Sequence, residues 1–271
     1  MLKDSKANKI FLLVLVAALA IFFGFGALRT KQNSKMTETF ALSDSADLSI
    51  RTESDDITLL SDPQATDLSF VYHGSGKATT KRDGEDLSII VSGGRNGSLT
   101  VTIPQSSTLG ELSLSTKSGA VDLPSLSVKD DVEIRTISGK VRLADLSAKE
   151  IEISTTNGDI SLASVTDREE TEISSTSGAL SLDSYHGSDL YLHTTSGSIT
   201  AASDMKRGTI RLLSTSGDLS FDLVQEKADY QLEARSTSGQ LDLPATKAGD
   251  GNVKVTLQST SGPIRFSSQK P

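Results

Sequence analysis

Hydrophobic and polar positions recur in a fixed order about every 20 residues from residue 111 onward. Each copy contains a Ser-Gly or Asn-Gly step, and the aligned glycines are Gly119, Gly139, Gly158, Gly178, Gly197, Gly217, Gly239 and Gly262. The intervals between them are 20, 19, 20, 19, 20, 22 and 23 residues. A period near 20 over eight copies is typical of a solenoid, in which one coil of chain is copied and stacked.

Within each copy, apolar residues alternate with polar ones on both sides of the glycine. In the second copy Val132 and Ile134 precede Gly139, while Val141 and Leu143 follow it. Alternation with a period of two predicts β-strands with one inward face, and the change of parity predicts a corner at the glycine. We expect glycine there because it accepts positive φ. The Ser or Thr three residues before each glycine is expected to form a ladder of hydroxyls between layers.

This pattern predicts an all-β fold: a parallel β-solenoid, or β-helix, with turns of about 20 residues over 111–266, each copy lying directly above the last at about 4.8 Å. A helical fold is disfavoured because the copies are rich in Ser, Thr, Val, Ile and Gly. A propeller blade needs about 40 residues. An antiparallel meander would need tight turns at both ends of each strand, whereas one corner signal recurs at one phase.

The two ends of the repeat array are expected to differ. Residues 47–110 fit the pattern loosely, with Asp55 in a glycine place, and we interpret them as irregular N-terminal β turns or a capping sheet. Only 267–271 follow the last copy as a tail. We therefore expect the C-terminal edge to be blunted by its own charged and proline residues, namely Pro263, Arg265, Lys270 and Pro271.

The N-terminal segment 10–28 contains 19 residues without a charge. As a helix it would rise about 28 Å, close to the hydrocarbon thickness of a bilayer. We expect a single transmembrane helix or signal anchor after a short cytoplasmic tail, 1–9, and before a polar tether, 29–46. A cleaved secretory signal is the alternative, with a cut after the small residues near 24–26. Both interpretations place the rest of the chain outside the cytoplasm.

Composition narrows the possible chemistry. The 271 residues include no Cys and no Trp, and aromatic residues make up 4%. Disulfides, zinc-thiolate sites and cysteine nucleophiles are therefore excluded. Residues 1–29 hold four basic and one acidic residue, so the remainder carries 23 basic against 34 acidic side chains. That excess of negative charge disfavours nucleic-acid binding.

No catalytic, metal or cofactor motif stands out. The three histidines are His73, His186 and His193, and the spacing of the last two matches no common metal site. No GxSxG motif occurs, and the glycine-rich 93–97 segment lacks the lysine and serine of a phosphate-binding loop. We therefore expect no enzyme activity, no cofactor and no bound metal.

One outward-facing set of residues is a candidate binding strip. Three glutamates lie six residues before successive glycines, an arginine lies four residues before the first of these glycines, and a histidine lies four residues before the glycine of the next copy. The members are Glu133, Arg135, Glu152, Glu172 and His193. Stacked carboxylates indicate either a solvated sheet face or an acidic strip that recognises a cationic partner such as a basic peptide or polymer.

The repeats read TKSGAVDL, TISGKVRL, TTNGDISL, STSGALSL, TTSGSITA, STSGDLSF, STSGQLDL and STSGPIRF. They resemble the bacterial putative-adhesin β-strand-repeat family of unknown function. Together with the N-terminal span, the chain is similar to LiaG-like membrane-anchored proteins of Gram-positive bacteria. The resemblance implies a cell-surface solenoid connected with envelope stress, and it supplies no catalytic residues.

Three classes of function follow for this chain. The first is a noncatalytic, membrane-anchored interaction or scaffold module, adhesin-like or envelope-stress-associated, exposed outside the cell. The second is a regulator that contacts a membrane sensor of envelope stress, and the third is a β-helix polysaccharide lyase or hydrolase. The expected partners are the membrane, through 10–28, and an envelope protein, a cationic peptide or a wall polymer.

Overall fold

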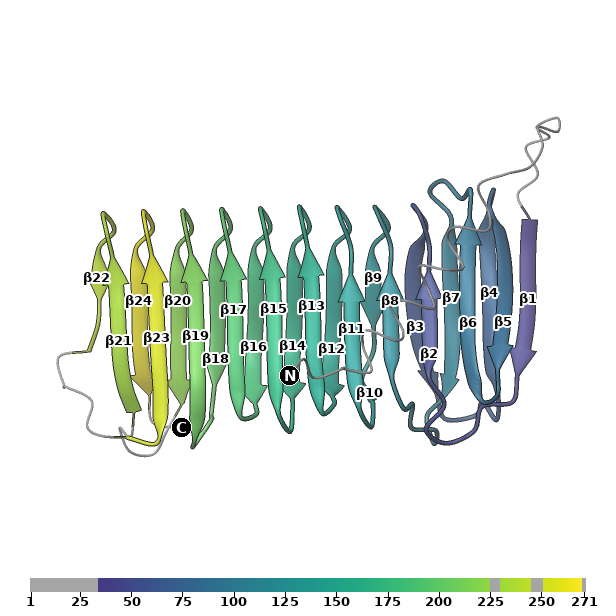
Figure 1. Ribbon diagram of the computed structural model, residues 1–271, viewed down its shortest axis with the longest axis horizontal. Coiled ribbons are helices and arrows are strands. Elements are labelled where there is room, and N and C mark those ends of the chain that lie inside the picture. The colour runs from purple at the N-terminus through teal and green to yellow at the C-terminus, as the bar shows by residue number, and fades with distance from the viewer. Residues whose placement is uncertain (1–33, 225–229, 245–250, 270–271) are drawn as a thin grey trace, which may run out of the picture. The chain divides into compact units, whose positions relative to one another are not determined.

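The computed structural model describes residues 34–224, 230–244 and 251–269, which form β-strands in two long sheets (Figure 1). The expected tail at 1–9 and span at 10–28 lie outside the described residues. Within the described ranges, no helix is long and apolar enough to cross a bilayer.

Sheet A contains one strand from each coil of the chain. In spatial order its strands are β1 (Ser34–Phe40), β4 (Leu68–Gly74), β7 (Ser98–Pro104), β3 (Asp56–Asp62), β9 (Val121–Leu123), β12 (Val141–Ser147), β14 (Ile160–Thr166), β16 (Leu180–His186), β18 (Ile199–Ser203), β20 (Leu219–Val224), β24 (Ile264–Gln269) and β22 (Leu241–Asp242). The short strand β10 (Leu126–Ser127) pairs with β12 beside this path.

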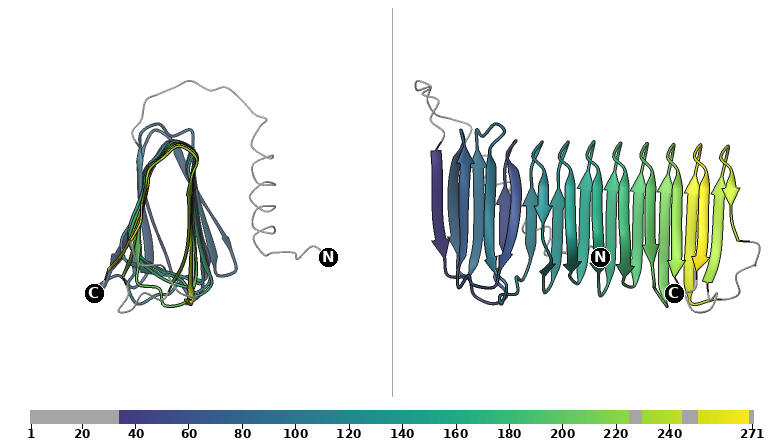
Figure 2. Two further views of the ribbon diagram at one scale, coloured as in Figure 1. Left: turned by 90° about the vertical axis from the view of Figure 1, so that its left-hand side faces the viewer. Right: turned by 180° about the vertical axis from the view of Figure 1, so that it is seen from behind.

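Sheet B contains the other strand of each coil. Its order is β21 (Tyr230–Ser236), β23 (Val253–Ser259), β19 (Gly208–Ser214), β17 (Asp189–Thr194), β15 (Glu170–Ser175), β13 (Glu150–Thr155), β11 (Asp131–Arg135), β8 (Leu112–Ser115), β2 (Leu48–Arg51), β6 (Asp86–Ser92) and β5 (Lys77–Asp83). Seen along the stack, the two sheets converge toward one narrow corner (Figure 2, left).

Successive coils pair in parallel and in register, as the repeat predicts. Ile153 is opposite Ile134 on one side and Ile173 on the other, and all three point inward and are buried. On the facing sheet, Leu143 and Leu162 pair in the same way. Two long parallel sheets are thereby established, and their coiled stacking is consistent with a β-solenoid.

The corner glycines stack in one column, but for a different reason from the one expected. Their φ angles lie outside the positive region, which among described glycines is occupied by Gly84, Gly93 and Gly208. What requires glycine is close backbone approach. A Cβ built on Gly178 would lie 1.7 Å from the carbonyl oxygen of Gly158 in the coil below. Any side chain at this column would force the coils apart.

The hydroxyls that precede these glycines join neighbouring coils. The Ser175 hydroxyl accepts a hydrogen bond from the Gly178 amide at 2.7 Å and contacts the Gly158 carbonyl at 3.4 Å. The predicted ladder between layers therefore exists, but each hydroxyl contacts a carbonyl oxygen of the neighbouring coil instead of another hydroxyl. At the first coils, the Thr52 hydroxyl instead lies 2.9 Å from the hydroxyl of Thr116.

The spatial order departs from the sequence order at the C-terminal end. Strand β23 lies between β19 and β21, and β24 lies between β20 and β22, so the last copy is inserted beneath the seventh. The expectation that each copy lies on the preceding one is wrong here. Pro263 and Arg265 belong to an internal coil and cannot blunt the edge, while Lys270 and Pro271 lie outside the described residues. The outermost coil is β21–β22.

The N-terminal end combines both structures expected for 47–110. The coil of β2 and β3 lies between the coil of β6 and β7 and that of β8 and β9. Strands β1, β4 and β5 run antiparallel to their neighbours and cover this end. Residues 34–40 of the predicted tether 29–46 form β1, an edge strand of sheet A, so this part is not a tether; residues 29–33 lie outside the described residues.

One polar cluster interrupts the aliphatic interior. Asp167 is 6% exposed, and its carboxylate accepts hydrogen bonds from the Thr171 hydroxyl at 2.6 Å, the Ser188 amide at 3.1 Å and the Tyr185 hydroxyl. Thr171 occupies a position that is aliphatic in most copies, such as Ile151. Within this cluster the buried polar groups satisfy one another's hydrogen bonds.

Candidate binding surfaces

The predicted glutamates form a column on the outer face of sheet B. Glu133, Glu152 and Glu172 pair in register on β11, β13 and β15, and neighbouring strands in a sheet lie about 4.8 Å apart. In the next coil the position is taken by Tyr191, and Arg211 follows with its guanidinium 5.7 Å from the centre of the tyrosine ring. The glutamate column therefore ends at this cation–π pair.

A second acidic column, which the sequence analysis missed, lies beside the first. Asp131, Glu150, Glu170 and Asp189 pair in register across β11, β13, β15 and β17. Each stands two residues before a member of the first column or its Tyr191 equivalent, so both columns share the outer face. The signal was available, because these acids lie eight residues before the aligned glycines.

Crowding of carboxylates perturbs their titration. Burial raises the pKa of Glu150, and the negative charge of Asp131 raises it further. Burial likewise raises the pKa of Glu170, with a second contribution from Glu150. Within the described residues, no ion pair reaches Glu170 or Glu172. This part of the face therefore carries uncompensated negative charge.

We predict that replacing Glu150 and Glu170 with glutamine stabilises the protein at neutral pH. A raised folded-state pKa contributes stability below the unfolded-state value, and this contribution is lost as pH rises through the folded value. The gain should stay below about 1 kcal/mol because both carboxylates reach solvent. Urea unfolding between about pH 4 and 7 should show a flatter pH dependence for E150Q/E170Q than for wild type. The exposed D44N variant is the control, and an unchanged slope in E150Q/E170Q would contradict the prediction.

The candidate basic residues occupy different places. Arg135 forms ion pairs with Glu133 and, at 2.8 Å, with Glu152, so it neutralises one end of the first column. His193 lies at the other end, opposite Ser174 on the neighbouring strand β15. The structure thus places Arg135 and His193 on one face but does not bring them together, since Ser154 and Ser174 lie between them.

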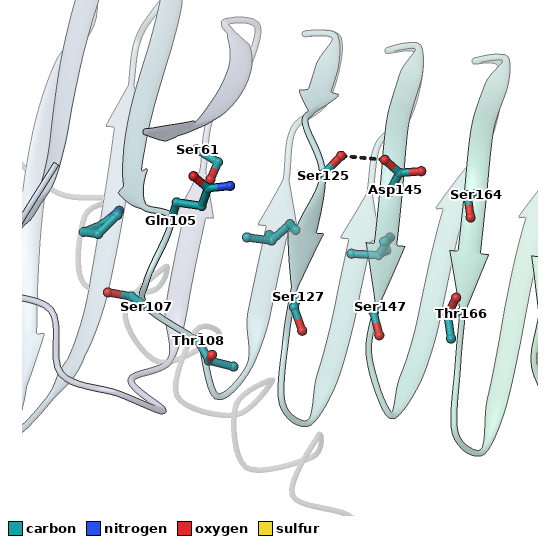
Figure 3. A pocket seen from close by; sticks show the side chains of 13 residues that line it. Ser61, Gln105, Ser107, Thr108, Ser125, Ser127, Asp145, Ser147, Ser164 and Thr166 are labelled. Atoms are coloured by element: carbon teal, nitrogen blue, oxygen red, sulfur yellow. Dashed lines mark hydrogen bonds between the residues drawn. The ribbon is translucent and has the colours of Figure 1, made fainter. Parts of the chain in front are cut away.

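A groove lined by hydroxyls lies on sheet A, and the sequence analysis did not anticipate it. Its volume is about 330 Å³, it is open to solvent, and its lining includes residues of β10, β12 and β14 (Figure 3). Its lining includes Ser125, Ser127, Asp145, Ser147, Ser164 and Thr166. The Ser125 hydroxyl donates to Asp145 at 2.6 Å. Such a surface can exchange hydrogen bonds with a hydroxylated ligand.

Next to this groove, three side chains form a Ser-His-Asp chain. The Ser184 hydroxyl lies 2.9 Å from Nε2 of His186, and Nδ1 of His186 lies 2.6 Å from Asp204. Hydrolytic triads use this order of contacts, but they also require oxyanion donors and a substrate cleft. Here the His186 and Asp204 side chains are 42% and 52% exposed, and Ser184 is not part of the groove lining.

The histidine and carboxylate side chains are spread over the described part of the chain. No group of three or more His, Cys, Asp or Glu side chains is arranged there to hold an ion. The two histidines of the YHGSDLYLH segment belong to different sheets, since His186 ends β16 in sheet A and His193 is in β17 of sheet B.

The fold defines a β-rich repeat protein built of two long, largely parallel sheets. The chain belongs to the toastrack DUF4097 family, which matches residues 46–269. This match confirms the family resemblance of the repeats. None of the curated proteins matches the chain.

Comparison with solved structures finds one that shares the fold, with a TM-score above 0.5, and others that match less closely. A "putative adhesin" from Bacteroides fragilis is 12% identical with a TM-score of 0.51, and the match covers 87% of this chain and 98% of that one. A "putative adhesin" from Parabacteroides distasonis is 9% identical with a TM-score of 0.45, covering 87% and 98%. Another from Parabacteroides merdae is 10% identical with a TM-score of 0.44, covering 87% and 96%. At these identities the likeness concerns the fold.

Proposed function

We propose that this protein is a noncatalytic, membrane-anchored interaction module of a bacterial cell envelope, with its repeat domain outside the cytoplasm. The observation that carries the proposal is the pair of carboxylate columns on sheet B, which run in register across three or four coils. The adhesin names of proteins with the same fold support the same class of function.

The spacing and charge of the columns fit an extended cationic partner. Their carboxylates repeat about every 4.8 Å along the stack, in two parallel rows on a flat face. A basic peptide or an amine-bearing wall polymer could place successive cations along these rows. Because most of the carboxylates are at least partly exposed, their attraction would mainly steer association and would weaken as salt is added.

We expect the triple variant Glu133→Gln, Glu152→Gln and Glu172→Gln to bind a short oligolysine peptide about tenfold more weakly than wild type. Three lost charge contacts of about 0.5 kcal/mol each correspond to that factor. Isothermal titration calorimetry at low salt measures the change. The control is D44N/D183N/D218N, which removes the same charge at exposed positions outside the columns. Equal binding by both triple variants and wild type would remove the basis of the proposal.

Anchorage through residues 10–28 is part of the proposal. Its support is the uncharged length of this segment, which matches the thickness of a bilayer. Fractionation of cells that express the full chain, followed by protease treatment from outside, tests it. Recovery of the repeat domain in the membrane fraction and its digestion in intact cells are expected, and a cytosolic, protected domain would contradict anchorage.

A regulator of a membrane sensor remains the alternative within the same class of binding protein. Crosslinking in intact cells separates the two roles. Capture of a membrane sensor would favour regulation, whereas capture of wall polymer would favour an adhesive role.

A hydrolase is the second alternative, and the Ser184–His186–Asp204 chain is the observation that favours it. A fluorophosphonate probe distinguishes this candidate from a noncatalytic module. Labelling of Ser184 that disappears in H186A would overturn the noncatalytic proposal. The exposure of His186 and Asp204 and the absence of Ser184 from the groove lining support the opposite outcome.

A further inference from the structure

At the C-terminal end of the stack, the edge strand β21 leaves apolar side chains only partly covered. Leu232 and Ala234 of β21 are only partly buried, although their neighbours one coil inward, Val255 and Leu257, are fully buried. At the same end, Leu241 and Leu243 are 43% and 37% exposed. These four side chains are the core residues of the last coil, and among the described residues no strand pairs with the outer side of β21 or β22.

The opposite end shows how an edge is normally protected. Strand β5 there carries Lys77, Lys81 and Arg82, all exposed, and charged side chains discourage pairing between edge strands. Strand β21 spans seven residues, Tyr230–Ser236, and its inward positions are largely apolar. A long edge of this kind is a template for another strand.

The hydrogen-bonding phase of β21 is defined by its pairing with β23. The Thr237 amide donates to the Ser259 carbonyl at 3.3 Å, and backbone groups alternate in direction along a strand. The amides and carbonyls of Leu232, Ala234 and Ser236 therefore point toward the open side. An antiparallel partner strand centred on Ala234 would meet all three residues in hydrogen-bonded positions.

The charges on β21 are self-complementary in that register. Glu233 and Arg235 lie on the outer face and form an ion pair of 3.0 Å within the strand. If Ala234 faces Ala234 of a second copy, Glu233 faces Arg235 of that copy, and the reverse pair forms as well. These are non-hydrogen-bonded positions, where directly opposite side chains approach most closely.

We propose that two copies of this protein associate end to end through antiparallel pairing of their β21 strands. The contact forms main-chain hydrogen bonds at the edge, two ion pairs between Glu233 and Arg235, and a shared cover for Leu232 and Ala234. It is isologous, as expected of a two-fold dimer. The proposal goes beyond binding by the sheet faces and does not depend on it.

Charge variants of the full chain in detergent, followed by analytical ultracentrifugation, test this register. Wild type is expected to dimerise, and Glu233→Arg to dissociate at least about tenfold more readily because it places Arg opposite Arg235. The exchange E233R/R235E restores the complementary pairs and should restore the dimer. Mixed with differently labelled wild type, the exchanged variant should form few mixed dimers, since like charges then meet.

Ala234→Pro provides an independent test that leaves the fold intact. Its ring removes an amide on the open side of β21, where proline is tolerated, so circular dichroism should not change while dimerisation is lost. A wild-type chain that stays monomeric at all concentrations would overturn the proposal. So would a dimer that persists unchanged in both E233R and A234P, because it would then use another surface.

Discussion

Replacing Gly178 with alanine is expected to destabilise the protein by about 3 kcal/mol or more, the upper range for forced overpacking. The added Cβ would lie 1.7 Å from the Gly158 carbonyl oxygen and 2.5 Å from its carbon. Neither coil can move away freely, because the same close approach recurs between Gly158 and Gly139 below and between Gly197 and Gly178 above. Separating the coils would weaken the ladder hydrogen bonds of both sheets and the packing between layers.

Urea unfolding measures this effect, and two controls isolate its cause. Ser177→Ala changes the exposed neighbour in the same corner and should cost less than about 0.5 kcal/mol. Gly84→Ala is the matched control for glycine conformation, because Gly84 has a φ of +63° and nothing within 4 Å of an added Cβ. It should cost about 1 kcal/mol. If G178A cost no more than G84A, close approach would not be the reason for the corner glycines.

Much of the fold could be predicted from the repeat period alone. Alternation around residues such as Ile153 predicted the inward faces of both strands, and the constant phase of the glycines predicted parallel, in-register pairing. The physical reason for glycine was misjudged, since sequence alone does not distinguish a positive φ from a close backbone approach. Only the stacked carbonyl at Gly158 shows which of these applies.

The sequence pattern does not predict the order in which the coils stack. Each copy presents the same inward residues and the same corner, so any copy fits against any other. The 253–266 copy is inserted beneath the 230–242 copy, and the periodicity of the sequence does not indicate this order. The same insertion leaves β21 as the edge strand and gives the C-terminal end its self-complementary charges.

Surface sites were predictable to the extent that they follow the repeat. The column of Glu133, Glu152 and Glu172 was found by alignment, and the adjoining column needed only the same alignment two residues earlier. The hydroxyl groove and the Ser184–His186–Asp204 chain depend on local breaks in the pattern. A register shift between Leu182 and Tyr185 places Ser184 in an irregular stretch of β16, which a repeat average conceals.

Asp167→Ala is expected to destabilise the protein by about 3 kcal/mol, because it leaves buried donors without their acceptor. Asp167 accepts from the Thr171 hydroxyl and the Ser188 amide, and it contacts the Tyr185 hydroxyl. The Tyr185 hydroxyl also contacts the Asp189 carbonyl at 2.8 Å, so it retains one acceptor. Tyr185→Phe alone should therefore cost less, about 1 kcal/mol.

The triple variant D167A/T171V/Y185F separates lost hydrogen bonds from lost packing. It removes the two side-chain donors together with their acceptor, leaving the Ser188 amide as the one donor that loses this acceptor. It also gives position 171 the aliphatic character of most other coils, so it should be more stable than D167A by at least about 1 kcal/mol. Urea unfolding measures all three variants. If the triple variant were less stable than D167A, the cluster would contribute packing more than satisfied polar groups.

The same cluster predicts a loss of stability in alkali. Burial, and then the hydrogen bond to Asp167, raise the pKa of Tyr185 above its ordinary value near 10. A raised folded-state pKa means that the stabilisation is complete below the unfolded-state value and declines as pH rises above about 10. Unfolding of wild type between about pH 9 and 11 should show this decline, and Y185F should show less of it. An identical alkaline slope in Y185F would mean that other tyrosines or lysines cause the loss, since phenylalanine has no proton to release.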